Sequence, residues 1–344
     1  MTRMTDALTA LPGRLVAKPA ATRRALATAQ DLAAAAWHEA DAAGRDAVTL
    51  DDLLVAFALV GGPVGRTLAA HGLTAEVLRA GVRDRDASDL AALGITPPPA
   101  AEPVRVPGRL DPRHFFRLDP EAARFLEKAA GSPAALLQEL TEHPSGRPGA
   151  ALRATGVDLP ALREALVGLG GAQAEDNAPA APIPGLLDGH RETTRRGRRW
   201  VPVPAEALGA VVGDAEAMRP LLLPEAEAAG QDVRVAPGLL ASSLKGRPFE
   251  YRLVRDEQID GGRELVWQMF WPEGVRPRGE GADPRGAYVH VRIEPDDGGS
   301  VLILTRGVRG FGRLGGIVGP LMAVFGGSGN RGMLRGILEQ ARRR

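Results

Sequence analysis

Hydrophobic residues recur every three or four positions through the first half of the chain, which is the spacing of amphipathic helices. The first such stretch is rich in alanine and covers residues 20–41. A second stretch follows Thr49, which stands where a helix N-cap is expected, three residues before Asp52. This spacing is typical of a capping box, in which each side chain accepts a hydrogen bond from the other residue's backbone N–H. The pattern predicts one helix over residues 20–41 and another that ends at Gly61.

Two shorter helices are expected next. Leu68 belongs to a helix that ends near Gly72, and Thr74 caps a further helix that carries Leu78. The first part of the chain therefore contains four predicted helices in a row, joined by short turns.

This order returns later in the chain. Asp119-Pro120 and Ser132-Pro133 each place a capping residue before a proline, as at the beginning of many helices. Three pairs of identical residues lie 84 positions apart, namely Leu68 and Leu152, Gly72 and Gly156, and Leu78 and Leu162. We therefore predict an internal duplication, with repeats at residues 20–82 and 118–169.

After residue 190 the hydrophobic period changes to two, which is typical of β-strands. Tyr288 and His290, for example, alternate with apolar residues. Strands are predicted over residues 200–203, 232–236, 249–255, 264–271, 287–294 and 301–308, with helices over 205–213 and 316–344. The sequence Asp296-Asp-Gly-Gly299 between the last two strands is typical of a hairpin turn.

Two segments rich in proline, alanine and glycine predict extended linkers, at residues 96–103 and 170–189. The first separates the two repeats, and the second separates the two halves of the chain. The expected fold therefore has two domains, an all-α domain over residues 15–169 and an α+β domain over residues 190–344.

Composition narrows the range of functions. With 43 basic and 42 acidic residues, the chain has no net field that attracts nucleic acid or an anionic membrane. It contains no cysteine, which excludes disulfides and thiolate chemistry, and its six histidines show no metal-binding spacing. We therefore expect no catalytic residue, no metal and no cofactor. The N-terminus lacks the apolar segment of a secretion signal, so a cytoplasmic location is expected.

Two glycine-rich stretches match the G-x-G-x-x-G pattern of dinucleotide sites, at residues 310–315 and 327–332. Only 29 residues follow Gly315, and they include no predicted strand, so a βαβ unit and nucleotide binding are not expected. The chain has no G-x-x-x-x-G-K-[ST] sequence, which excludes a P-loop ATPase. An apolar run over residues 314–329 is shorter than the ~20 residues that span a bilayer. We expect it to pack on the sheet, with a membrane-touching tail as the alternative.

The first repeat has a second helix of the form V-[ST]-x-[DE]-x-L-L, of which the second repeat keeps Ser132 and Leu136-Leu137. Both repeats have a first helix and an ending of the form L-x-x-x-G-[LV]. This combination resembles the N-terminal domain of the Clp family of protein unfoldases over residues 15–169. The resemblance implies an all-helical pseudo-dimer that binds substrates, adaptors, phosphoarginine-tagged chains or cyclic peptide antibiotics. The ATPase part of that family is absent here.

The same resemblance implies a ligand groove. Asp51 occupies the acidic position that contacts phosphoarginine in such domains, whereas the second repeat has Pro133 there. Leu15 and Leu118 precede the first helices of the repeats and would line an apolar groove, with Glu127 as a polar contact. One of the two phosphoarginine-binding pockets is thus expected to be missing, which favours an apolar partner over phosphoarginine.

In the second half, a strand, a short helix, an antiparallel sheet and a long closing helix follow one another. This order resembles the START and polyketide-cyclase-like (SRPBCC) helix-grip superfamily over residues 190–344. The resemblance implies a curved sheet around the last helix and an apolar cavity for a lipid or aromatic ligand. The residues that we expect in this cavity are Trp267, Tyr288 and His290.

Simpler roles stay open for two of these residues. Asp51 could serve only as a negative charge in the first turn of its helix. His290 could be a solvent-facing residue of a sheet with one polar face.

The duplicated motif without a P-loop favours a non-enzymatic binding protein. The leading hypothesis is an adaptor, regulator or decoy that offers a Clp-like groove to peptide degradation signals or Clp-directed cyclic peptides, including antibiotic sequestration. The alternative hypothesis places the function in the helix-grip domain, which would bind a lipid or polyketide or catalyse a cyclisation, with the helical half as a docking handle. A third hypothesis joins the two, with the helical half docked on a Clp ATPase and a hydrophobic small molecule held as cargo by the other half.

Overall fold

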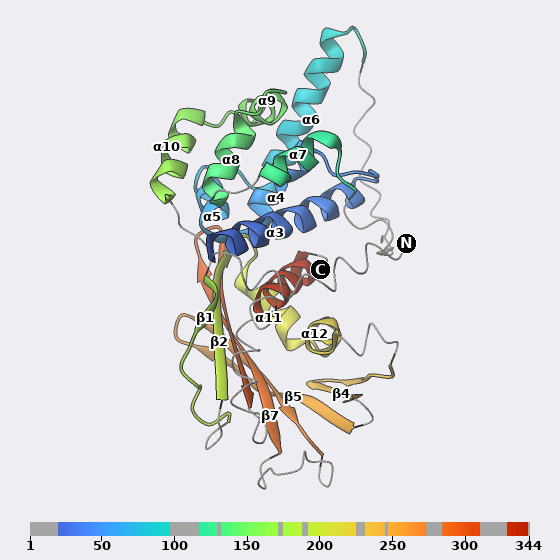
Figure 1. The fold of residues 1–344 in the computed structure, drawn as a ribbon, viewed down its shortest axis with the longest axis vertical. Coiled ribbons are helices and arrows are strands. Elements are labelled where there is room, and N and C mark those ends of the chain that lie inside the picture. Colours follow the sequence, from blue (N-terminus) through green and yellow to red (C-terminus); the bar gives the residue numbers. More distant parts are fainter. Residues whose placement is uncertain are drawn as a thin grey trace. The chain divides into compact units, whose positions relative to one another are not determined.

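The computed structural model divides the chain into two compact units, Met1–Gln173 and Ala174–Arg344. The residues that it describes are 20–96, 117–128, 132–170, 175–187, 192–224, 231–244, 247–272, 284–309 and 329–342. Within these ranges the named elements of the first unit are helices, and those of the second unit are strands and helices (Figure 1). The predicted change from a helical half to a half that contains a sheet is therefore present.

The helices of the first unit follow the order expected for a duplication. They are α3 (Ala20–Ala42), α4 (Leu50–Val60), α5 (Gly62–Ala70), α6 (Ala75–Ala92), α7 (Pro120–Lys128), α8 (Pro133–Thr141), α9 (Arg147–Ala154) and α10 (Leu159–Leu169). Helices α8, α9 and α10 begin 83, 85 and 84 residues after α4, α5 and α6. Gly72 and Gly156 follow α5 and α9 and share a left-handed backbone, with φ of 73° and 76°. The repeat predicted from residue pairs thus extends to the backbone.

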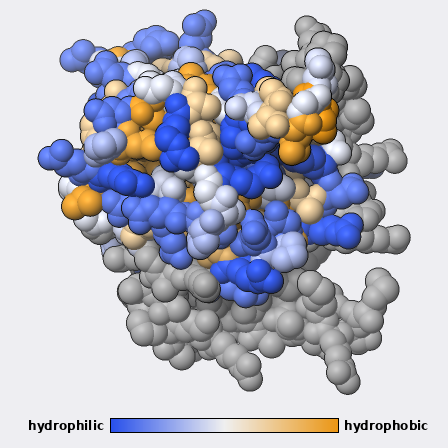
Figure 2. All heavy atoms as spheres, turned by 90° about the horizontal axis from the view of Figure 1, so that it is seen from above, coloured by the Kyte–Doolittle hydropathy of each residue, from blue (hydrophilic) through white to orange (hydrophobic). Residues whose placement is uncertain are grey.

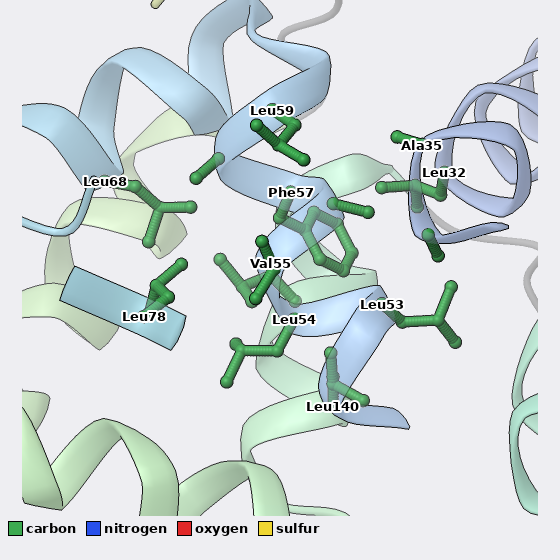
Figure 3. Packing of buried hydrophobic residues seen from close by; sticks show 14 of the residues in the cluster. Leu32, Ala35, Leu53, Leu54, Val55, Phe57, Leu59, Leu68, Leu78 and Leu140 are labelled. Atoms are coloured by element: carbon green, nitrogen blue, oxygen red, sulfur yellow. The ribbon is translucent and has the colours of Figure 1, made fainter. Parts of the chain in front are cut away.

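Helix α4 is the centre of the first unit. Ten of its eleven residues are buried, so it is enclosed on all sides instead of presenting one apolar face. Phe57 lies in the middle of the cluster, with Leu32 of α3, Leu68 of α5 and Leu140 of α8 around it (Figure 3). Both repeats therefore contribute to a single hydrophobic core.

The predicted helix caps of the first unit are confirmed. Thr49 N donates to Asp52 Oδ2 at 2.9 Å, and Asp52 N donates to Thr49 Oγ1 at 3.4 Å. Gly61 follows α4 with φ of 75°, a conformation that residues with a Cβ rarely adopt. Asp119 and Ser132 accept hydrogen bonds from the third residues of α7 and α8.

The second unit contains an eight-stranded antiparallel sheet. The strands are β1 (Glu175–Pro179), β2 (Glu192–Val201), β3 (Arg234–Ala236), β4 (Leu239–Leu244), β5 (Arg247–Ile259), β6 (Gly262–Phe270), β7 (Arg285–Asp296) and β8 (Gly299–Arg309). Their order in the sheet is β1-β2-β8-β7-β6-β5-β4-β3. The predicted hairpin turn is confirmed, since β7 and β8 are joined by Asp297 and Gly298, and Gly298 has φ of 69°.

Three elements of this unit were not predicted. Strand β1 falls within the segment expected to be a linker, and it pairs with β2 through the backbone at the edge of the sheet. Strand β4 has the sequence Leu-Leu-Ala-Ser-Ser-Leu, which shows no period of two. Helix α12 (Ala215–Leu222) contains Pro220 in its interior. In each case the sequence pattern is that of a loop, and tertiary contacts decide the structure.

Three helices pack on one face of the sheet, which we call the inner face. They are α11 (Ala205–Gly213), α12 and the helix of residues 329–342 (Figure 1). The inner-face core joins Leu208 of α11, Met218 of α12 and Ile337 of the last helix to Val291 and Leu304 of the sheet. This arrangement agrees with the helix-grip architecture that the sequence resembles. The expected beginning of the last helix near Gly316 lies outside the described residues, as do the glycine-rich stretch 310–315 and most of the apolar run.

Within the described ranges, no single helix has the length and hydropathy to span a membrane. Helices α4 and α5 reach those values only when taken together across a bend of 95°.

The close packing of α6 on α9 gives a stability prediction. A Cβ on Gly81 would lie 2.5 Å from the backbone oxygen of Ala151, so Gly81→Ala must push the helices apart. We expect a loss of about 1–3 kcal/mol in the free energy of unfolding, as in other overpacked cores. Urea unfolding followed by the helical circular dichroism signal measures this change.

The matched control is Gly168→Ala in α10, where a Cβ would meet no atom within 4 Å. Because alanine has the higher helix propensity, this variant should be neutral or more stable by up to ~1 kcal/mol. Equal effects of the two substitutions would contradict the proposed packing of α6 on α9.

Candidate functional site

The inner face of the sheet is fully buried at one end and half-buried at the other. Leu265, Val291 and Leu302 have no accessible surface beneath the helices. Toward the start of β7 and the end of β8, the inner-face residues keep part of their surface exposed. They are Phe249, Tyr251, Met269, Ala287, Arg306 and Val308, and we call them the open end. This is the helix-covered side of the sheet, yet the helices do not fully cover these side chains.

Arg306 is the charged residue of the open end. Its guanidinium occupies the space that a side chain at Gly329, in the last helix, would fill. Burial lowers the pKa of Arg306, while nearby Tyr251 acts in the opposite direction. Burial likewise raises the pKa of Tyr251, opposed by the charge of Arg306. At neutral pH the site therefore holds a guanidinium cation and a neutral phenol, which can donate a hydrogen bond.

Two polar side chains near this end have buried atoms without a hydrogen-bond partner. Arg195 of β2 is the cross-strand neighbour of Arg306, and its Nε is buried without a hydrogen-bond partner. Neither arginine forms an ion pair with any described residue. Asn330 follows Gly329 and is 1% exposed, and neither its side-chain oxygen nor its nitrogen has a partner. Like charges on directly opposite residues and unpaired buried amides are unfavourable in an empty site.

The other face of the sheet, here called the outer face, carries two of the residues predicted for the cavity. The Tyr288 hydroxyl donates to Glu192 Oε1 at 2.6 Å and accepts from Ile183 N at 3.3 Å. Leu186 and Leu187 pack against its ring. Burial and the bond to Glu192 raise the pKa of Tyr288 to about 12. The phenol is thus a fixed part of the packing between the outer face and residues 183–187.

His290 lies on the same outer face. Its Nε2 is 3.2 Å from Glu264 Oε1, and Glu264 is also bonded to Arg255. Burial lowers the pKa of His290, with Glu264 opposing the shift. The imidazole is therefore neutral at neutral pH and donates its Nε2 proton to Glu264. The side chain is largely buried, which corrects the alternative that it faces solvent.

Trp267 lies on the opposite face from Tyr288 and His290. In the register of β6 and β7 it pairs with Val289, while Gln268 pairs with Tyr288. Its ring is fully buried in the inner-face core, and Nε1 donates to the carbonyl oxygen of Val212 at 2.7 Å. The three residues expected in one cavity therefore do not meet, because consecutive strand residues point to opposite faces.

In the helical unit, Asp51 is held by arginines of the chain itself. Its carboxylate accepts two hydrogen bonds from Arg85 of α6, at 2.7 and 2.9 Å, and one from Arg147 of α9 at 3.1 Å. Burial acts to raise the pKa of Asp51, but the bonds and charges of Arg85 and then Arg147 outweigh it and lower the pKa. Asp51 thus links the two repeats. Contact with a phosphoarginine, as the resemblance implies, would require this cluster to open.

Of the other predicted groove residues, the structure describes Leu118 and Glu127. Leu118 forms an isolated parallel bridge with Val48 and packs against the core before α7. Glu127 is exposed on the last turn of α7. Leu15 lies outside the described residues. The viewed surface in Figure 2 shows hydrophobic residues in separate groups among hydrophilic ones.

No group of three or more histidine and acidic residues that could hold a metal ion occurs within the described part of the chain. The polar side chains of the open end are an arginine and a tyrosine, which are suited to binding an anion or a hydroxyl group.

Sequence reasoning missed Arg306 and Tyr251, although a signal was present. In the predicted strand over residues 301–308, Arg306 is two and four residues after Leu304 and Leu302, so it shares a face with these buried leucines. A charged residue at an inward position of a strand is a candidate ligand contact. Tyr251 likewise stands between Phe249 and Leu253 in an alternating pattern.

Comparisons with known proteins give similarities of structure alone. No protein-family model matches the chain, and no curated protein matches it. A STAR-related lipid transfer protein from Xanthomonas axonopodis is 16% identical over 48% of this chain and 99% of its own, with a TM-score of 0.30. Human STARD10 is 12% identical over 49% of this chain and 74% of its own, with a TM-score of 0.28. The protein TTHA0849 from Thermus thermophilus is 16% identical over 44% of this chain and 97% of its own, with a TM-score of 0.27.

Removing the charge of Asp51 should destabilise the helical unit. Asp51→Asn removes one of the two carboxylates that pair with the buried Arg85, and Asp86 stays as the other. Breaking a buried pair costs about 3–5 kcal/mol in the free energy of unfolding when no partner is left, and we expect a loss below that range here. Because the folded pKa of Asp51 is lowered, its contribution is present above the unfolded carboxyl pKa of about 3.9 and is lost as the pH falls through the folded pKa. The difference between wild type and Asp51→Asn should therefore shrink below pH 4 in unfolding experiments.

Glu142→Gln is the control, since it removes a carboxylate from a surface ion pair with Arg163. A surface pair contributes about 0–1 kcal/mol, so little change is expected. An Asp51→Asn variant as stable as wild type at neutral pH would show that the Asp51 cluster does not hold the repeats together.

Proposed function

We propose that the second unit binds an apolar small molecule at the open end of its inner face, and that the protein is a binding protein and not an enzyme. This corresponds to the alternative hypothesis from the sequence, with the ligand site moved from Tyr288 and His290 to the other face of the sheet.

The observation that carries this proposal is the incomplete burial of the open end. Phe249, Met269, Ala287 and Val308 are apolar and lie on the side of the sheet where the helices pack, yet they keep accessible surface. Burying apolar surface contributes about 25 cal/mol per Å², so an apolar ligand that covers these residues gains binding free energy. Small-molecule sites are commonly apolar with a few polar groups, as here with Arg306 and Tyr251.

Binding without catalysis fits the chemistry of the open end. Its described polar side chains are Arg306 and Tyr251. Arg306 is a cation at neutral pH although burial lowers its pKa, because a guanidinium is a very weak acid, and burial raises the pKa of Tyr251 and so keeps it a neutral phenol. A general base needs a group that can accept a proton near neutral pH, and neither side chain meets this requirement. His290 and Glu264 lie on the outer face, separated from this site by the sheet.

For the helical unit we infer a role in recognising peptides, which include degradation signals, Clp-directed cyclic peptides and segments of a Clp ATPase. The observation that supports it is the repeated order of α4–α6 and α8–α10, which agrees with the duplication of Clp N-terminal domains. Because Asp51 is bound by Arg85 and Arg147, we expect an apolar cyclic peptide to bind and a phosphoarginine peptide not to bind.

Titration of the full chain with both peptides tests this inference for the helical unit. Binding of the cyclic peptide alone is the expected result, and binding of neither would remove the peptide-recognition hypothesis. Co-purification with a Clp ATPase would distinguish a docking handle from a free-standing decoy.

Binding at the open end can be measured with the neutral dye Nile red. We expect the full chain to increase the dye's fluorescence saturably. Ala287→Trp should weaken the affinity about tenfold or more, because the indole fills space of the open end next to Met269 and Val308. Circular dichroism monitors the fold of the variant.

Val254→Trp is the control. Val254 is 45% exposed, so this substitution introduces the same indole at a surface position. This variant should bind the dye as the wild type does. The proposal fails if the wild type takes up no dye, or if a folded Ala287→Trp binds it with unchanged affinity.

A further inference from the structure

We propose that the ligand of the open end carries an acid group, a carboxylate or a phosphate attached to its apolar body, and that this group is bound between Arg195 and Arg306. The inference builds on the proposed function of the second unit and adds the chemical class of the ligand.

The first argument is the pairing of two cations. Arg195 and Arg306 are opposite residues of β2 and β8 in an unbroken antiparallel register, so their side chains leave the same face of the sheet. Arg306 contacts Gly329 of the last helix, which identifies that face as the inner one. Two positive charges in this position repel each other, and a bound anion between them removes the repulsion.

The second argument is the position of the acidic residues. On β2, β6 and β7 the carboxylates lie on the outer face, where Glu192 bonds to Tyr288, Glu264 to Arg255 and Glu294 to Arg292. The pleat of the sheet prevents these groups from reaching the inner face. On the inner side, Asp256 is held by Arg263 beside α11, at the fully buried end. None of these carboxylates forms an ion pair with Arg195 or Arg306.

The third argument is the match between donors and an acid group. A guanidinium presents a planar fork of N–H groups that fits the two oxygens of a carboxylate or phosphate. The Tyr251 hydroxyl is close enough to Arg306 for each to shift the other's pKa, and it can donate a further bond. Asn330 adds an amide without a partner beside Gly329. The apolar residues of the open end would then contact the body of the ligand.

The test compares ligands that differ only in the head group, using the full chain and displacement of Nile red. The probes are dodecanoate, dodecyl phosphate, dodecan-1-ol and inorganic phosphate. We expect at least one of the two acids to bind about tenfold or more tightly than the alcohol, as charged hydrogen bonds would give. Inorganic phosphate alone should not displace the dye.

The wild-type comparison separates the two levels of the proposal without any variant. If the acids and the alcohol displace the dye equally, the acid-group inference is wrong and the apolar site stands. If no dye is bound, the proposed function itself fails. Displacement by inorganic phosphate as effective as by dodecyl phosphate would show an anion site without an apolar ligand, and would overturn the inference.

Variants then assign the head group to its residues. Arg306→Met should lose the preference for acid over alcohol while binding dodecan-1-ol within about twofold of wild type, because the methionine keeps the apolar contact. Arg306→Lys keeps the positive charge but lacks the planar array of N–H donors, so it should retain part of the preference for acid over alcohol. Arg195→Met should weaken acid binding as well.

Arg196→Met is the matched control, since Arg196 is the next residue of β2 and is exposed on the outer face. It should leave the acid preference unchanged. The inference is overturned if Arg306→Met and Arg195→Met both keep the wild-type preference, or if Arg196→Met abolishes it.

Discussion

Successive residues of a β-strand point to opposite faces of the sheet, and this alternation governs the second unit. It places Trp267 in the core beneath the helices and sends Tyr288 and His290 to the outer face. The same alternation separates the charges. The carboxylates of Glu192 and Glu264 lie on the outer face, while Arg195 and Arg306 lie on the inner face and form no ion pair with a described residue. The candidate site follows from this separation, because unpaired cations next to half-buried apolar residues are suited to an amphiphilic acid.

The helical unit is organised by a different constraint, the enclosure of α4. A helix that is buried on all sides needs neighbours on all sides, and both repeats provide them. An ionic cluster among these helices joins Asp51 of the first repeat to Arg147 of the second. The acidic residue that the resemblance assigns to ligand binding is thereby used to connect the repeats. A groove partner would have to be recognised by other residues.

The two units thus suggest a division of roles. The second unit has the features of a small-molecule site, with half-buried apolar side chains and an arginine pair. The first unit has a duplicated helical scaffold, and its buried polar residues serve structure. Binding of a small molecule by one unit and of a peptide by the other would be coupled only if the bound small molecule changed the affinity for the peptide.

The sequence alone determined the order of the helices, the capping box at Thr49 and Asp52, the central strands and the hairpin at Gly298. These features depend on local spacing and on backbone conformations favoured by particular residues. It could not place β1 or β4, because neither has the alternating pattern of a strand, although each pairs with the next strand along the chain. Nor could it find the site. The alternation of strand residues shows that Arg306 and Leu304 share a face. Only the tertiary structure shows that Arg195 lies opposite Arg306 and that Arg306 contacts the last helix at Gly329. It also shows that the carboxylates of Glu192 and Glu264 lie on the other face of the sheet. Those facts depend on strand order and register, which bring together residues more than a hundred positions apart.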